Sequence, residues 1–131
     1  METKKQLSKG RLWTSYILQG LVIIMFLQGA VQYLLKTDMA VESATTIGFS
    51  ESAIFYFGLI LLIITLLYAI PKTSVLGAIL ITAWLGGAVV AHILHRDVIG
   101  FILFPVFFGI IVWFSIWLRS EQLWRLIPIK K

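Results

Sequence analysis

Two histidines are the residues of this chain most suited to binding a metal or a ligand. His92 and His95 are its only histidines, and they lie three residues apart in an apolar stretch. On a helix this spacing places both side chains on roughly one face. Ligands on one face do not hold a haem iron from opposite sides, and a metal site would need Asp97 or an unidentified residue as its third ligand. We therefore assign no metal site and interpret the pair as hydrogen-bonding groups at the membrane surface.

His92 also suits a lipid-soluble ring compound such as a quinone. A quinone headgroup needs a hydrogen-bond donor near a carbonyl oxygen, inside an apolar pocket lined by aromatic rings. Gln28 and Gln32 lie one helical turn apart, so both amides are able to face the other helices. From these residue types we predict a ligand site comprising His92, Gln32, Gln28, Tyr33 and Trp84. The alternative is structural, because Tyr and Trp often anchor helices at the membrane surface and amides often bridge membrane helices.

Other kinds of chemistry are excluded by what the sequence lacks. The chain has no cysteine, which excludes disulfides, thiolate metal sites and a dithiol relay of its own. Its four long apolar stretches contain no carboxylate, lysine or arginine, although coupled transporters usually carry an ionisable group inside the bilayer. No catalytic residue is identified, so we do not expect the chain to be an enzyme on its own. A quinone is the only cofactor that its residues suggest.

The apolar stretches predict an all-α membrane protein. Of 131 residues, 60% are hydrophobic and 13% are charged, which is too apolar for a soluble domain of this size. A helix needs about 20 apolar residues to cross a hydrocarbon core of about 30 Å. Four stretches meet this requirement, and the helices are predicted at about residues 12–34, 53–70, 75–94 and 98–118. We expect residues 1–131 to form one domain, an antiparallel bundle of four transmembrane helices.

Short connections predict the order of the helices in the bundle. Residues 71–74 and 95–97 leave so little chain between helices that the second, third and fourth must be antiparallel neighbours. Ser50 and Glu51 suit the start of the second helix, because a hydroxyl caps free amides and a carboxylate favours the positive end of the helix dipole. Asp97 is a candidate cap for the fourth helix.

The connection between the first and second helices is the only long one. It covers residues 36–52 and mixes polar with apolar side chains. We predict a short interfacial helix over part of residues 39–46, followed by a turn at Gly48. This segment should lie at the membrane surface rather than across it.

Small residues predict where helices approach one another. Ala83, Gly87 and Ala91 form a ridge at four-residue spacing, which would let another helix pack closely in lipid. Pro105 removes a backbone hydrogen bond from the fourth helix, so we expect a kink there that shapes the packing. The third helix is therefore predicted to be the centre of the bundle.

Lysine and arginine predict the orientation in the membrane. One side of the predicted bundle carries nine of these residues: Lys4, Lys5, Lys9, Arg11, Lys72, Arg119, Arg125, Lys130 and Lys131. The other side carries Lys36 and Arg96 only. By the positive-inside rule both termini are predicted in the cytoplasm, in a multi-pass protein of the cell inner (plasma) membrane. The outer side then presents Lys36, His95, Arg96 and Asp97 as candidate contacts for a partner protein or a lipid headgroup.

The order of these features resembles the DoxX-like family of small four-helix membrane proteins. The residues that carry the resemblance are the following: 29–36 at the end of the first helix, Gly48-Phe49, 70–73 leading into 75–78, 85–88 with His92, Pro105, and Trp113 before Leu118-Arg119. The resemblance implies a four-helix fold over nearly the whole chain. Its name-giving member is a subunit of an archaeal thiosulfate:quinone oxidoreductase, and more remote relatives act as cargo receptors or assembly chaperones. No catalytic residue is carried over.

Two classes of function remain open at this point. One is an accessory subunit of the DoxX-like type, which holds a quinone-like, lipid-soluble ligand or docks a redox partner. The other is a membrane adaptor or assembly factor without a small-molecule ligand. Membrane lipids are expected partners, and a protein partner and a homodimer are further hypotheses. Nucleic acid is not expected, because the basic residues lie at helix ends rather than along one soluble face.

Overall fold

A computed structural model describes residues 8–129 of the chain and contains helices and turns throughout this range. The helices are α1 (Lys9–Leu35), α2 (Asp38–Ile47), α3 (Glu51–Ala69), α4 (Ser74–Leu94), α5 (Ile99–Trp117) and α6 (Glu121–Leu126), with a 3₁₀ turn, η1 (Pro71–Thr73), between α3 and α4. Four of them, α1, α3, α4 and α5, are long and apolar enough to cross a membrane. The protein is thus a multi-pass membrane protein, and the four predicted spans are confirmed with ends that differ by no more than three residues.

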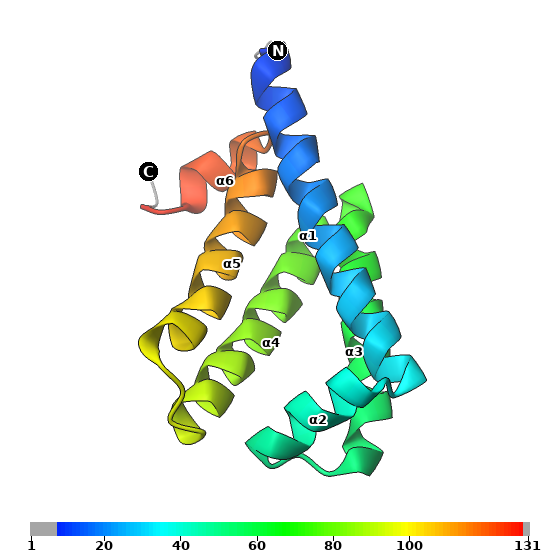
Figure 1. The fold of residues 1–131 in the computed structure, drawn as a ribbon. Helices are drawn as coiled ribbons and strands as arrows, with labels where there is room; N and C mark the ends of the chain where they lie inside the picture. The colour runs from blue at the N-terminus through cyan, green and yellow to red at the C-terminus, as the bar shows by residue number, and fades with distance from the viewer. Residues whose placement is uncertain (1–7, 130–131) are drawn as a thin grey trace.

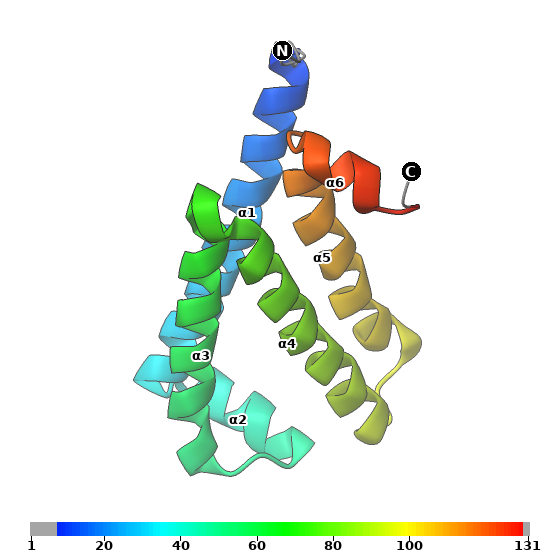
Figure 2. The ribbon, with the colours of Figure 1, turned by 180° about the vertical axis from the view of Figure 1, so that it is seen from behind.

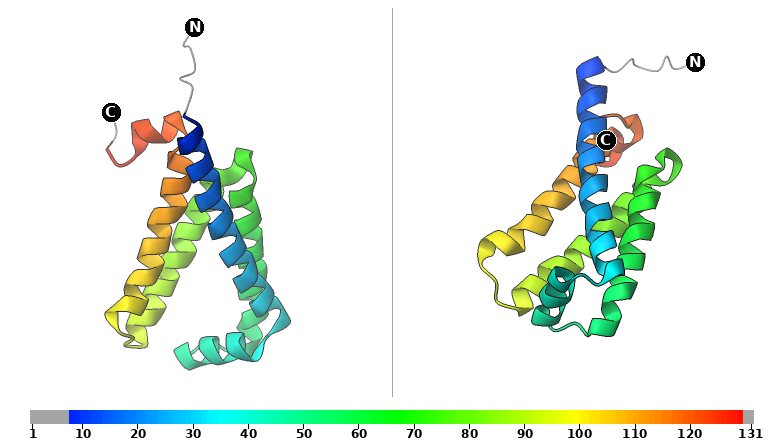
Figure 3. Two further views of the ribbon diagram at one scale, coloured as in Figure 1. Left: turned by 45° about the horizontal axis from the view of Figure 1, so that its top comes forward. Right: turned by 45° about the vertical axis from the view of Figure 1, so that its right-hand side comes forward.

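The four long helices form two antiparallel pairs, α1 with α3 and α4 with α5 (Figure 1). The pairs meet at the end of the bundle that holds α6, η1 and the start of α1, which we call the terminal end. They diverge toward the opposite end, and there α2 lies across the opening and contacts α1, α3 and α4. The view from behind and the two tilted views show the same arrangement (Figures 2 and 3). We call this second end the α2 end.

The tightly packed core lies in the half of the bundle nearer the terminal end. Tyr68, Ile81, Val112 and Ile116 are almost completely buried there, with contributions from α3, α4 and α5. Lipid tails are as apolar as these side chains, so helix association in a membrane depends on close packing and hydrogen bonds rather than on the hydrophobic effect. Between the two helix pairs, a cavity remains at the wider α2 end.

Two glycines allow the closest helix contacts. A methyl group added at Gly77 would fall on the backbone of Tyr68, and would lie 2.8 Å from the carbonyl carbon of Leu67. A methyl group added at Gly58 would lie 2.8 Å from the backbone nitrogen of Leu34 in α1. Both positions therefore require glycine, because any side chain would push two helices apart.

The predicted small-residue ridge is placed differently. Ala83, Gly87 and Ala91 line a cavity, and a methyl group added at Gly87 would meet nothing within 4 Å. Within the described chain this ridge does not make the close helix contact that we predicted for it. Pro105 is buried in α5, which continues through it.

The segment between α1 and α3 folds as predicted. Lys36 ends α1 in the left-handed conformation, with φ of 50°. The Thr37 hydroxyl then accepts a hydrogen bond from the Ala40 backbone amide at 3.3 Å, which caps α2. Gly48 ends α2 with φ of 115°, a value that favours glycine. The short helix and the turn at Gly48 are both confirmed.

Two predicted caps need correction. Ser50 occupies the N-cap position of α3, but its hydroxyl bonds to the Ser52 hydroxyl at 3.2 Å instead of a backbone amide. The N-cap of α5 is Val98, which has no polar side chain. Asp97 lies one position earlier, and its carboxylate is bound to His92 instead. The Asp97 carboxylate is therefore used to orient the His92 ring and does not cap α5.

Candidate functional site

A cavity of about 460 Å³ lies under α2, between the two helix pairs, and we call it the α2-end cavity. Its volume falls in the range of sites for small organic ligands. Helix α1 contributes Tyr33, α2 contributes its inward face, α3 contributes Phe57, and α4 contributes the longest wall. The full lining is Tyr33, Ser43, Ala44, Ile47, Phe49, Phe57, Ala83, Trp84, Gly87, Ala88, Ala91 and His92.

Four aromatic rings shape one side of the α2-end cavity. Phe57 is at their centre, with ring centroids 6.2 Å from Tyr33, 4.8 Å from Phe49 and 5.9 Å from Trp84. All three pairs are edge-to-face, the arrangement that aromatic quadrupoles favour. The rings hold one another in place, so they give the cavity a firm aromatic wall.

His92 is the residue of the cavity best placed for chemistry. Its Nδ1 lies 2.6 Å from Asp97 Oδ2, and its ring stacks on Phe101 with centroids 6.2 Å apart. The turn after α4 brings the carboxylate back, with Arg96 in the left-handed conformation and the Asp97 amide donating to the His92 carbonyl at 3.1 Å. Asp97 therefore orients the imidazole and occupies Nδ1, which leaves Nε2 for a ligand.

Three residues that line the cavity have a polar side-chain atom without a partner. The Tyr33 hydroxyl, the Trp84 indole nitrogen and His92 Nε2 have no hydrogen-bond partner among the described residues. No fully buried side-chain nitrogen or oxygen in residues 8–129 lacks a partner, so these three atoms are accessible and not sealed in the core. An apolar cavity with a few free polar groups is the general form of a small-molecule site.

The predicted ligand-site residues are only partly brought together. His92, Tyr33 and Trp84 line the same cavity although they come from two helices. Gln28 is exposed on the outer face of α1, and Gln32 is partly exposed and outside the lining. A helix turns by 100° per residue, and Tyr33 follows Gln32 directly. The side chains of these two residues therefore point in different directions, and only Tyr33 lines the cavity.

The residues predicted at the outer side lie in the two turns of the α2 end. Lys36 and Arg96 are exposed, and each is in the left-handed conformation. Asp97 is the only one of the group that reaches the cavity wall, through His92. His95 is exposed, and its Nε2 lies 3.8 Å from the other Asp97 oxygen.

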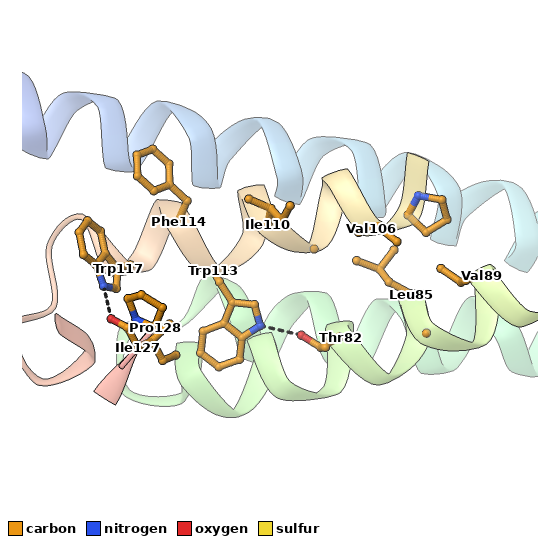
Figure 4. Close-up of a pocket in the computed structure, with 13 residues that line it drawn as sticks. Thr82, Leu85, Val89, Val106, Ile110, Trp113, Phe114, Trp117, Ile127 and Pro128 are labelled. Carbon is orange, nitrogen blue, oxygen red and sulfur yellow. Dashed lines mark hydrogen bonds between the residues drawn. The ribbon is translucent and has the colours of Figure 1, made fainter. Parts of the chain in front are cut away.

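A larger space of about 810 Å³, the α4–α5 groove, runs along the outside of the bundle (Figure 4). Its polar groups are already paired. Trp113 Nε1 donates to the Thr82 hydroxyl at 2.7 Å, and Trp117 Nε1 donates to the Ile127 carbonyl at 3.1 Å. The remaining lining is apolar and faces lipid. The groove therefore has the shape for an acyl chain but no free polar group to orient a ring, and we do not select it as the functional site.

A polar network at the terminal end was missed by the sequence reasoning. Arg11, Ser15 and Gln19 of α1 donate to the backbone carbonyls of Leu118, Ser115 and Tyr68, in that order. These carbonyls lie at or just past the ends of α5 and α3, where a helix has no internal donor for them. The signal was present in the sequence, because Arg11, Ser15 and Gln19 are spaced four residues apart on one face of α1.

Tyr68 and Arg119 extend this network. The Tyr68 hydroxyl donates to the Val112 carbonyl at 2.8 Å and also bonds the Ser115 hydroxyl. Arg119 donates to the Ser15 hydroxyl at 2.6 Å and to the Gln19 side-chain oxygen. The network joins α1, α3 and α5, so it stabilises the end of the bundle at which the helix pairs meet.

The comparison with known families identifies the family of this chain. The model of the DoxX-like family matches residues 17–115, which include α3 and α4 completely and most of α1 and α5. The chain belongs to the DoxX-like family. No curated protein and no solved structure matches this DoxX-like protein significantly. The resemblance inferred from its sequence is confirmed, and the α2-end cavity lies within the matched residues.

Proposed function

We propose that this DoxX-like protein binds a lipid-soluble, quinone-like ring compound in the α2-end cavity. The observation that carries the proposal is that His92, Tyr33 and Trp84 line one apolar cavity and that each has a polar side-chain atom without a hydrogen-bond partner among residues 8–129. His92 and Tyr33 provide groups for the two carbonyl oxygens of a ring, and the edge-to-face aromatic wall provides its apolar contacts. A bound quinone would supply two-electron redox chemistry.

This chain's own residues would bind and orient the ligand. Asp97 holds the His92 imidazole by Nδ1, so that Nε2 keeps one direction. Helix α2 covers the cavity with Ser43, Ala44 and Ile47 and shields the ring from water. With no cysteine in the chain, transfer of electrons from a thiol would need a partner protein. The function is thus that of an accessory subunit, which holds a ligand for a redox partner.

We further propose that both termini lie in the cytoplasm and that the α2-end cavity opens on the outer side of the cell inner membrane. The basis is the distribution of lysine and arginine, with nine on the side of the termini and two on the other. A redox partner would then dock at the α2 end, against Lys36, His95 and Arg96. A cavity at that depth is accessible to ring compounds that diffuse in the bilayer.

Two neighbouring glycines of α4 provide a matched test. Gly87 lines the α2-end cavity and Gly86 lines the α4–α5 groove, and a methyl group at either would meet nothing within 4 Å. Gly87→Leu should fill the α2-end cavity and lower the affinity for a short-chain ubiquinone analogue at least tenfold. Gly86→Leu should leave this affinity unchanged. Tryptophan fluorescence quenching during titration measures both, because Trp84 is in the cavity wall.

His92→Ala and His95→Ala are a second matched pair. His92→Ala should weaken binding about five- to tenfold, which corresponds to one lost hydrogen bond of about 1–1.5 kcal/mol. His95→Ala should have little effect, since His95 is exposed and outside the cavity. If Gly87→Leu and Gly86→Leu bind the analogue equally well, the ligand proposal is wrong. Co-purification of a stoichiometric protein partner, with loss of that partner in Gly87→Leu, would then favour the adaptor function.

A further inference from the structure

A polar pocket of about 610 Å³ lies at the terminal end, on the opposite side of the bundle from the α2-end cavity. It is bounded by η1 with the start of α4 on one side and by the turn between α5 and α6 on the other, and we call it the η1 pocket. Its cationic groups are Lys72 and Arg119, and its neutral polar groups include Ser74, Ser120 and Gln122. Neither cation has a role in the ligand site at the α2 end.

Arg119 is the group in this pocket that most needs an anion. Its guanidinium is partly buried and donates to two neutral acceptors, the Ser15 hydroxyl and the Gln19 side-chain oxygen. Its central carbon also lies over the Tyr16 ring, 4.5 Å from the centroid. No carboxylate of residues 8–129 lies within 4.0 Å of it. Partial burial of a charge without an opposite charge is costly, and an anion in the pocket would offset this cost.

The charge balance of the η1 pocket also favours an anion. Lys72 and Arg119 contribute two positive charges and Glu121 contributes one negative charge, which leaves one net positive charge. Glu121 is exposed and makes no ion pair with either cation within the described residues. The carboxylate therefore does not neutralise the cations, and Arg119 keeps N–H donors for a ligand because a guanidinium has more of them than its two bonds here use.

The surroundings of the pocket are those of a membrane boundary. Trp124 is in its lining, and the Arg11 guanidinium lies 4.1 Å from the Trp124 ring centroid. Indole rings and arginine side chains gather at the level of lipid headgroups. With the termini in the cytoplasm, as proposed above, the η1 pocket lies on the side of the membrane where basic pockets between helices are suited to phosphate headgroups of anionic lipids. Charge, burial and position thus agree on one chemical class of ligand.

We propose that the η1 pocket binds a phosphate group, carried by an anionic phospholipid or present free in solution. Arg119 forms the fixed base of the site, because Ser15 and Gln19 hold its guanidinium. Lys72 closes the site from the opposite side as a flexible point charge. The bound phosphate bridges the α3–α4 connection to the α5–α6 turn, so it also stabilises the terminal end of the bundle.

Removal of Lys72 tests the proposal without disturbing the helix contacts of Arg119. The wild-type protein, Lys72→Gln and the control Arg125→Gln are placed in nanodiscs of equal parts phosphatidylglycerol and phosphatidylcholine. Arg125 is exposed at the same end and does not line the pocket. After delipidation, native mass spectrometry counts the phosphatidylglycerol retained on each protein. We expect retention to fall about fivefold more in Lys72→Gln than in Arg125→Gln.

A second arm tests free phosphate as the source. Lipid-free protein in detergent is heated in sodium phosphate and in sodium chloride of equal ionic strength. A higher melting temperature in phosphate, lost in Lys72→Gln and kept in Arg125→Gln, would assign the site to soluble phosphate. Equal loss of phosphatidylglycerol in both variants, with no specific effect of phosphate, would show only diffuse surface charge and would overturn the proposal. The η1 pocket and the α2-end cavity lie at opposite ends, so either proposal can fail without the other.

Discussion

Replacement of Gly77 by alanine should destabilise the bundle although it improves helix propensity. The added methyl group falls on the backbone of Tyr68 and lies 2.8 Å from the Leu67 carbonyl carbon, so α3 and α4 must move apart. Overpacking of this kind costs about 1–3 kcal/mol or more. Replacing glycine by alanine inside a helix stabilises the helix by about 1 kcal/mol. The movement also displaces Tyr68, whose carbonyl and hydroxyl bind Gln19 and Ser115, so we expect a net loss of about 2 kcal/mol.

Gly86→Ala is the matched control for this prediction. Gly86 lies in the same helix, and a methyl group there would meet nothing within 4 Å. It should therefore stabilise the protein by up to about 1 kcal/mol, which puts the two variants about 3 kcal/mol apart. Equilibrium unfolding in mixed micelles of dodecyl maltoside and sodium dodecyl sulfate, followed by circular dichroism, measures both. A Gly77→Ala variant as stable as Gly86→Ala would refute the close packing of α4 on the end of α3.

Three further predictions concern the two ends of the bundle. Gln19→Leu should cost about 1–2 kcal/mol in the same unfolding assay, because it removes the donor to the Tyr68 carbonyl and one of the two acceptors of the Arg119 guanidinium. Gln28→Leu on the outer face should change stability by less than about 0.5 kcal/mol. Thr37→Val removes the hydrogen bond that caps α2 and should lower the local stability of this helix by about 1 kcal/mol. Hydrogen exchange should then be about fivefold faster for the backbone amides of α2 and unchanged for those of α4. Because the chain has no cysteine, a single cysteine introduced as Ser50→Cys or Ser120→Cys reports the orientation directly. A membrane-impermeant maleimide added to intact cells should label Ser50→Cys and should not label Ser120→Cys. The reverse pattern would contradict the proposed topology.

The helices were predictable because lipid leaves so few alternatives for the backbone. Every polar backbone group inside a bilayer must be bonded within its own segment, so an uncharged apolar stretch of sufficient length forms a helix. The short helix α2 was also predictable, since Gly48 stops a segment of mixed polarity too short to span. Local signals of this kind depend on neighbouring residues only.

The candidate site was predicted in part. His92, Tyr33 and Trp84 were chosen as donors and rings suited to a quinone, and they line one cavity. Gln28 was chosen because it lies one helical turn from Gln32, so that both amides could face the other helices, but α1 turns Gln28 outward. The outward face of a membrane helix is as apolar as its inward face, so hydrophobic patterning does not reveal which amide is inside.

The choice of packing residues shows the same limit. Spacing alone made Gly87 a packing residue, yet Gly58 and Gly77 make the close contacts and Gly87 faces open space. Which glycine meets a backbone depends on the rotation and crossing of two helices that are far apart in the sequence. Asp97 was likewise predicted to cap the fourth helix, but its carboxylate bonds His92, five residues earlier in the chain.

The sequence by itself determined that the chain spans the membrane four times, where the helices begin and end, and to which family it belongs. These properties follow from apolar length, charge and local motifs, each of which acts within a single segment. Only the tertiary structure decided that the helix pairs diverge under α2 to leave a cavity at His92, and that Arg11, Ser15 and Gln19 serve the free carbonyls of α3 and α5. Contacts between segments depend on helix rotation, and in lipid that rotation is set by close packing and hydrogen bonds rather than by polarity.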